Sequence, residues 1–178
     1  MTTRRDFLKT MTMASAGLAL GAGDILANPT FASQRKITDK VKIAYVGIGN
    51  RGEQIIGDFA RTGMVEVVAL CDVDMGAPHT QKVMNLYPKA KRFRDFRQMF
   101  DKAGNEFDAV AIATPDHSHF PISMLALASG KHVYVEKPLA RTFYEGELLM
   151  QAALKRPNLV TQVGNQGHSE ANYFQFKA

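Results

Sequence analysis

Three glycines and a downstream acid form the pattern with the clearest chemistry in this sequence. Residues 47–52 read Gly-Ile-Gly-Asn-Arg-Gly, directly after the apolar run Val41–Val46 and at the opening of a helical segment. Glycines at this spacing permit a tight turn, a close approach of the backbone to a pyrophosphate, and close packing of helix on strand. Backbone N–H groups at the start of the helix also favour an anion. The motif predicts a dinucleotide-binding loop made by Gly47, Gly49, Asn50, Arg51 and Gly52.

The acid is Asp72, which lies 20 residues after Gly52 and directly follows the second apolar run. A carboxylate at this place accepts hydrogen bonds from the ribose hydroxyls of NAD. It also repels a 2′-phosphate, at a cost on the order of 4 kcal/mol for like charges about 4 Å apart. The sequence therefore predicts NAD rather than NADP as the cofactor. Two alternatives stay open: Asp74 in the same role, or Asp72 as a turn residue only.

Short β-branched runs alternate with helical segments from residue 41 onward. The expected strands are Val41–Val46, Val65–Leu70, a short one near Arg92–Phe93, Ala109–Ala113, His132–Val135 and Leu159–Val163. The expected helices include Gln54–Arg61, Ala77–Leu86, Phe96–Lys102, Pro121–Ser129 and Tyr144–Leu154. Nearly continuous apolar strands separated by helices are typical of a parallel sheet covered on both faces. Residues 40–164 are thus predicted to be an α/β domain with a Rossmann-type doubly wound parallel sheet.

Three further stretches carry a family resemblance. They are Ala-Thr-Pro-Asp-His-Ser-His at 113–119, Glu-Lys-Pro at 136–138, and Gln-Val-Gly-Asn-Gln at 162–166. Together with the glycine-rich loop they resemble the Gfo/Idh/MocA oxidoreductases, which include glucose–fructose oxidoreductase and inositol dehydrogenase. The resemblance runs from about Lys42 to the end of the chain. It implies positions beside the cofactor for Thr114, Pro115, His117, His119, Glu136 and Lys137, and often a cis peptide before Pro138.

Lys137 is the predicted catalytic residue. It follows the fifth main strand, and open α/β sheets bind ligands at the carboxyl ends of their strands. A partly desolvated lysine there can act as an acid or base on a substrate hydroxyl. The alternative is that Glu136 and Lys137 form a solvated turn.

The remaining histidines and the cysteine give weaker indications of a functional role. Two histidines and an acid at Asp116, His117 and His119 could bind a metal, but three such residues in one short loop rarely converge on an ion without a further ligand. We therefore expect no metal and assign these side chains to hydrogen bonding near the cofactor. His79 and His132 belong to no convincing constellation. Cys71 stands alone, which excludes an internal disulfide and indicates a buried strand thiol.

The first 32 residues have the layout of an export signal. Arg4 and Arg5 precede Phe7 and Leu8, and the weakly apolar run 11–22 is too short for a membrane span. This pattern resembles a twin-arginine signal, so residues 1–32 are expected to be a signal peptide and linker. We accordingly expect the translocation machinery as a partner and a periplasmic or otherwise exported protein. A disordered basic N-terminus is the alternative.

The formal net charge is +5, and its clearest basic cluster is Lys89, Lys91, Arg92, Arg94 and Arg97, interrupted by Phe93 and Phe96. No nucleic-acid motif accompanies it. We expect a solvated face over two core phenylalanines and no nucleic-acid partner.

The family resemblance also implies a second domain that supplies the substrate pocket. Residues 165–178, with Gly167, His168 and Ser169, are expected to begin the crossover to that C-terminal domain, which is apparently missing. The expected function is that of an NAD-dependent dehydrogenase acting on a hydroxyl of a sugar, cyclitol or glycoside, homo-oligomeric at full length. One alternative is an NAD-dependent glycosidase using transient oxidation, although such relatives often depart from Glu-Lys-Pro. The other is a fragment that binds NAD without chemistry.

Overall fold

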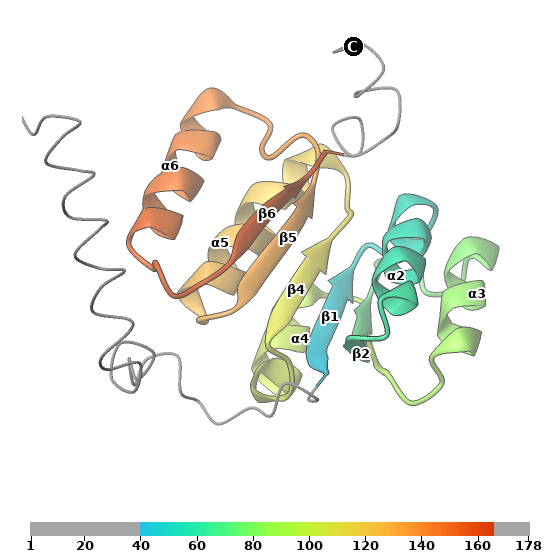
Figure 1. The fold of residues 1–178 in the computed structure, drawn as a ribbon. Coiled ribbons are helices and arrows are strands. Elements are labelled where there is room, and N and C mark those ends of the chain that lie inside the picture. Colours follow the sequence, from blue (N-terminus) through green and yellow to red (C-terminus); the bar gives the residue numbers. More distant parts are fainter. Residues whose placement is uncertain (1–39, 166–178) are drawn as a thin grey trace, which may run out of the picture. The chain divides into compact units, whose positions relative to one another are not determined.

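The computed structural model describes residues 40–165, which form a six-stranded parallel sheet. Its strands in chain order are Val41–Val46 (β1), Val65–Cys71 (β2), Lys91–Phe93 (β3), Ala109–Ile112 (β4), His132–Glu136 (β5) and Thr161–Gly164 (β6). They lie in the order β3-β2-β1-β4-β5-β6, so the winding direction reverses between β1 and β4 (Figure 1). The predicted Rossmann-type doubly wound sheet is confirmed. Ligands of such sheets bind at this reversal.

Five α-helices and two short 3₁₀ helices connect the described strands. The α-helices are Arg51–Arg61 (α2), Pro78–Leu86 (α3), Phe96–Ala103 (α4), His119–Ala128 (α5) and Phe143–Leu154 (α6), and the 3₁₀ helices are Gly104–Glu106 (η1) and Asp116–Ser118 (η2). Side chains alternate between the two faces of β1: Ile43 and Tyr45 pack with α2 and α3, whereas Ala44 and Val46 pack with α4 and α5. This period of two explains why the whole strand reads as apolar.

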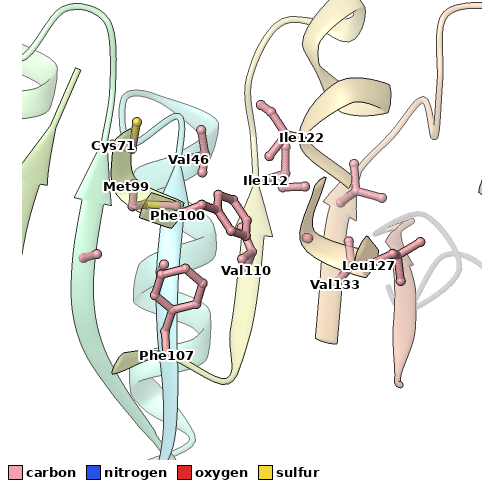
Figure 2. Close-up of a cluster of buried hydrophobic side chains, with 14 of the residues drawn as sticks. Val46, Cys71, Met99, Phe100, Phe107, Val110, Ile112, Ile122, Leu127 and Val133 are labelled. Carbon is pink, nitrogen blue, oxygen red and sulfur yellow. The ribbon is translucent and has the colours of Figure 1, made fainter. Parts of the chain in front are cut away.

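The face under α4, α5 and α6 holds the larger apolar cluster. Figure 2 shows Met99, Phe100 and Phe107 beside Val110 of β4, with Ile122 and Leu127 of α5 farther along the sheet. The rings of Phe100 and Phe107 meet edge to face with their centroids 5.5 Å apart. Burial of each such side chain contributes about 1.5–3 kcal/mol. This cluster fixes the loops at the carboxyl ends of β1 and β4.

The opposite face is organised around Phe59 of α2. Its ring packs edge to face against the rings of Tyr45 of β1 and Tyr134 of β5, with centroid separations of 6.4 Å and 5.3 Å. Helix α2 therefore spans the sheet from β1 to β5. It begins at the glycine-rich loop, so this packing sets the position of the loop relative to the residues that follow β5.

Most element boundaries differ from the sequence prediction by no more than one residue, whereas the starts of α2, α5 and β6 differ by two or three. Helix α5 starts at His119, two residues before the predicted Pro121, because a proline in the first helical turn needs no acceptor for a backbone N–H. Strand β6 starts at Thr161 rather than Leu159, because the N–H of Leu159 turns back to the carbonyl of Arg156. The short strand near residues 92–93 is confirmed as β3.

Some expectations concern parts of the chain that the structure does not describe. The predicted signal peptide at 1–32 and nearly all of the predicted crossover at 165–178 lie outside residues 40–165. Within residues 40–165, no helix combines the length and the apolar character needed to cross a bilayer.

Candidate functional site

A cleft of about 650 Å³ lies at the carboxyl ends of the central strands. Its volume falls in the range of small-molecule and cofactor sites. The loops after β1, β2, β3 and β4 line it, which places it where the winding of the sheet reverses. Seven predicted site residues line this cleft: Gly47, Gly49, Asn50, Asp72, Thr114, Pro115 and His117.

The glycine-rich loop packs too tightly for side chains at two of its positions. Gly47 has φ of +80°, and a Cβ there would lie 2.5 Å from the carbonyl oxygen of Ala113. A Cβ on Gly52 would lie 2.0 Å from the carbonyl oxygen of Gly47. The N–H of Gly52 donates to the carbonyl of Gly49 at 2.8 Å, and α2 begins at Arg51. The backbone N–H groups of the α2 terminus consequently lie at the cleft, where they favour an anion.

Asp72 ties the glycine-rich loop to the end of β2. Its Oδ2 accepts the N–H of Ile48 at 2.9 Å, and its Oδ1 accepts the N–H of Asp74 at 3.0 Å. An ionised carboxylate has about four acceptor sites, so two remain for a ligand. Asp72 therefore stabilises the turn after β2, which is one of the alternatives left open by the sequence. Its carboxylate can still accept hydrogen bonds from a ligand in the cleft.

Thr114 supplies the clearest sign that the cleft suits a polar ligand. Its Oγ1 is buried and has no hydrogen-bond partner among the described residues. A buried polar atom without a partner costs about 1–3 kcal/mol, and a ligand in the cleft would relieve this cost. A glycine-rich cradle, a carboxylate and this hydroxyl are the groups that a dinucleotide needs, so the residues present fit one.

His119 connects the two loops that flank the far end of the cleft. Its ring is buried, with Nε2 2.8 Å from the carbonyl oxygen of Thr114 and Nδ1 2.6 Å from that of Pro138. Backbone contacts thus occupy both ring nitrogens, and His119 does not line the cleft. The geometry favours a positioning role, and direct contact of His119 with the cofactor stays a prediction.

Glu136 and Arg51 pair with each other. The Nε and one terminal nitrogen of Arg51 both donate to Oε1 of Glu136, at 3.1 and 3.0 Å. The hydroxyl of Tyr134 donates to the same oxygen at 3.3 Å, and the N–H of Lys137 donates to Oε2 at 3.2 Å. Burial and the neighbouring Glu136 raise the pKa of Tyr134, which keeps its hydroxyl a donor. The first residue of α2 is thereby linked to the loop after β5, although neither Arg51 nor Glu136 lines the cleft.

Lys137 lies at the carboxyl end of β5 and is exposed. Because the side chain is exposed within residues 40–165, the described part of the chain does not provide the partial desolvation expected for it. The peptide between Lys137 and Pro138 is cis, as the family resemblance implied. The His119 bridge holds this peptide next to the Thr114 loop, so Lys137 is adjacent to the cleft.

Sequence reasoning missed three basic side chains of the cleft: His79, Arg94 and Arg97. Arg94 and Arg97 are exposed, as the sequence predicts for a solvated face, but the sequence did not predict that they line the cleft. They line the cleft because β3 pairs with β2, which places the loop after β3 beside Asp72. The strand order of a Rossmann-type sheet was the signal that could have identified them. The other part of that expectation agrees with the structure, since Phe93 and Phe96 pack against the apolar core.

The thiol of Cys71 also borders the cleft. Burial, together with the nearby Asp72 and Asp95 carboxylates, raises its pKa to about 12. The thiol is therefore protonated at neutral pH and unsuited to act as a nucleophile. Within residues 40–165, no group of three or more His, Cys, Asp or Glu side chains is arranged to hold a metal ion.

Comparison with known proteins identifies solved structures of the same fold and a family model that matches most of the chain. Residues 41–164 match the family model GFO_IDH_MocA, described as an oxidoreductase family with an NAD-binding Rossmann fold. A solved structure of scyllo-inositol dehydrogenase from Lactobacillus casei, with bound NAD(H) and scyllo-inositol, is 27% identical with a TM-score of 0.67. That similarity covers 78% of this chain and 40% of the dehydrogenase chain.

Curated relatives are found among glycosidases. The chain is 29% identical over 161 residues to an alpha-N-acetylgalactosaminidase of Shewanella oneidensis, and 28% identical over 160 residues to glycosyl hydrolase family 109 protein 2 of Shewanella sp. strain ANA-3. Each similarity covers 80% of this chain, which spans only 35% of the length of each relative. The match to the family model nevertheless includes every described strand. The chain therefore belongs to the Gfo/Idh/MocA oxidoreductase family and carries that family's NAD-binding Rossmann domain.

Proposed function

We propose that the protein containing this chain transfers a hydride between NAD(H) and a hydroxyl-bearing carbon of a sugar, cyclitol or glycoside. The observation that carries the proposal is the cleft itself, which is lined by the glycine-rich loop, Asp72 and Thr114, whose buried hydroxyl has no partner among the described residues. These groups match a pyrophosphate, a ribose diol and a further polar group of one extended ligand. The solved dehydrogenase that binds NAD(H) and scyllo-inositol supports the same class of reaction.

Each residue of the site has a defined task in this proposal. The α2 terminus and the glycine-rich loop bind the phosphates, and Asp72 accepts hydrogen bonds from the ribose. When bound, the nicotinamide accepts a hydride from the substrate carbon. Lys137 would act as the base that takes the proton from the substrate hydroxyl, so that loss of this proton and of the hydride converts the alcohol to a carbonyl. His119 and Glu136 hold the loop that carries Lys137.

The curated relatives favour a second candidate, a glycosidase that uses NAD for transient oxidation. The proton and hydride transfers at the substrate carbon would be the same, but the hydride returns to the sugar after the glycosidic bond breaks. Net NADH production therefore separates the two candidates. This chain retains Glu-Lys-Pro at 136–138, which keeps the dehydrogenase first.

The experiment uses the protein that contains this chain at the length of its relatives. It is incubated with NAD and either scyllo-inositol or a chromogenic α-N-acetylgalactosaminide. Accumulation of NADH in proportion to oxidised substrate supports the dehydrogenase. Release of the chromophore without net NADH supports the glycosidase, and the absence of both reactions contradicts hydride transfer to either class of substrate.

We also propose that the protein leaves the cytoplasm through the twin-arginine pathway and that the full-length protein is a homo-oligomer. Support for export comes from the sequence alone, from Arg4, Arg5 and the weakly apolar run that follows. Replacement of both arginines by lysine should leave the protein in the cytoplasm, as measured by cell fractionation. Unchanged export of this double variant would identify a signal of another type.

A further inference from the structure

The ring of His79, on α3, lies against the glycine-rich loop, although the sequence pattern assigned His79 to no constellation. A Cβ added to Gly49 would lie 2.2 Å from Cδ2 of His79 and 2.8 Å from its Nε2. The imidazole thus stands over the glycine at which a Rossmann loop approaches a pyrophosphate. The side chain is exposed and lines the 650 Å³ cleft. Neither ring nitrogen has a hydrogen-bond partner within residues 40–165.

The backbone that carries His79 is firmly held. Its neighbour Thr80 is fully buried, and the Thr80 hydroxyl lies 2.8 Å from the carbonyl oxygen of Asp74 and 2.9 Å from that of Ala77. Lys82 on the same helix pairs with Glu53 of α2, which joins the two helices that flank the glycine-rich loop. The position of the imidazole beside Gly49 is therefore a consequence of the fold.

The helix that carries His79 favours a negatively charged ligand at its first turn, although Asp72 and Asp74 of the preceding loop also line the cleft. His79 is the second residue of α3, and the first turn of this nine-residue helix contains no acidic residue. The positive end of the helix dipole consequently meets no side-chain carboxylate from its own turn. Helix α2 begins on the other side of Gly49, so backbone N–H groups and the imidazole face the same space from two helices.

We propose that His79 donates a hydrogen bond from its imidazole to the pyrophosphate of the dinucleotide bound on the glycine-rich loop. The inference rests on the proposed NAD binding. It assigns a cofactor contact outside the glycine-rich motif, from the helix after β2. In this arrangement Gly49 has two functions, because the absence of a side chain admits the phosphate and also makes room for the ring.

Calorimetric titration of the 178-residue chain with NAD and with ADP-ribose tests this contact. His79→Phe keeps a ring over Gly49 but has no N–H, and should weaken both ligands about tenfold to a hundredfold, the range for a hydrogen bond to a charged group. His79→Gln keeps an N–H donor and should recover part of the loss. Lys89→Gln removes an exposed positive charge shortly after the same helix and outside the cleft, and should change affinity less than threefold.

The possible results distinguish a failure of the His79 contact from a failure of the proposed NAD binding. Wild-type chain that fails to bind NAD contradicts NAD binding itself. Wild-type binding that is unchanged or tightened in His79→Phe overturns the contact, since the ring then either does nothing or obstructs the phosphate. An equal loss in Lys89→Gln also overturns it, because the general positive charge around α3 would then explain the effect.

Discussion

At the scale of single residues, the carboxylate of Asp72 has a structural role in two loops and a predicted role in binding the ribose. It fixes the N–H groups of Ile48 and Asp74 and so shapes the glycine-rich loop and the turn after β2. The sequence pattern predicted the ribose role from the distance to Gly52. It could not show that the same oxygens already hold backbone groups, because that depends on the loop conformation.

The raised pKa values of the buried Cys71 thiol and Tyr45 hydroxyl predict a loss of stability at alkaline pH. Burial raises the pKa of Cys71 to about 12 and shifts that of Tyr45 upward as well. Both groups hold their protons more tightly in the folded state than in the unfolded chain. Their contribution to the free energy of unfolding is therefore complete below about pH 9, where the thiol of the unfolded chain begins to ionise. This contribution is lost as the pH rises toward 12.

Urea unfolding between pH 8 and 11 measures this effect. The free energy of unfolding should fall above pH 9 in the wild type and fall less steeply in Cys71→Ala, which lacks the thiol. The comparison cancels the contribution of lysines, which titrate in both proteins. Identical slopes in the two proteins would show that Cys71 contributes nothing to the pH dependence.

At the scale of the elements, hydrophobic pattern was enough to predict the fold and most helices and strands. The sequence prediction included all six described strands, although the three-residue β3 contains no β-branched residue. Pattern could not identify which loops lie side by side. His79, Arg94 and Arg97 reach the cleft only because α3 packs beside α2 and β3 pairs with β2, and these are tertiary contacts.

The link between Arg51 and Glu136 is the element-scale contact with the clearest measurable effect. Glu136 is almost buried, whereas Arg51 is 36% exposed, so solvent screens part of the attraction. Arg51→Ala should lower the free energy of unfolding by about 1–3 kcal/mol, because a buried carboxylate loses its main partner. Addition of Glu136→Gln should cost less than the sum of both single changes, with a coupling of about 0.5–3 kcal/mol.

Arg61 provides the control, because it pairs with Asp58 on the same helix with both side chains exposed. Arg61→Ala should change the free energy of unfolding by less than about 1 kcal/mol. Additive effects of Arg51→Ala and Glu136→Gln in urea denaturation would show that the pair does not connect α2 to the loop after β5.

At the scale of the whole molecule, the chain provides a cofactor cleft and Lys137 but leaves Lys137 exposed. A substrate pocket needs walls on both sides of the nicotinamide, and the chain spans about a third of the length of its curated relatives. We therefore expect the 178-residue chain to bind NAD without oxidising sugars or cyclitols at a measurable rate. Steady-state NADH formation tests this, and turnover by the chain alone would mean that it carries a complete site.

The same reasoning gives a prediction for Lys137 in the protein at the length of its relatives. Lys137→Ala should lower kcat by roughly 10²–10⁴, the usual contribution of a positioned proton-transfer group. NAD affinity should change little, because Lys137 does not line the cofactor cleft. A variant with unimpaired kcat would reduce Lys137 to a structural role.

Every functional role proposed for this chain requires that the cleft binds NAD. Calorimetric titration of the 178-residue chain with NAD and NADP tests this claim. We expect one NAD per chain and at least a hundredfold weaker binding of NADP, because Asp72 repels a 2′-phosphate. In Asp72→Ser the difference in affinity between NAD and NADP should narrow, because the carboxylate predicted to repel the 2′-phosphate is removed while the basic Arg94 and Arg97 still line the cleft. No binding of NAD, or equal affinity of the wild-type chain for the two cofactors, would contradict the account.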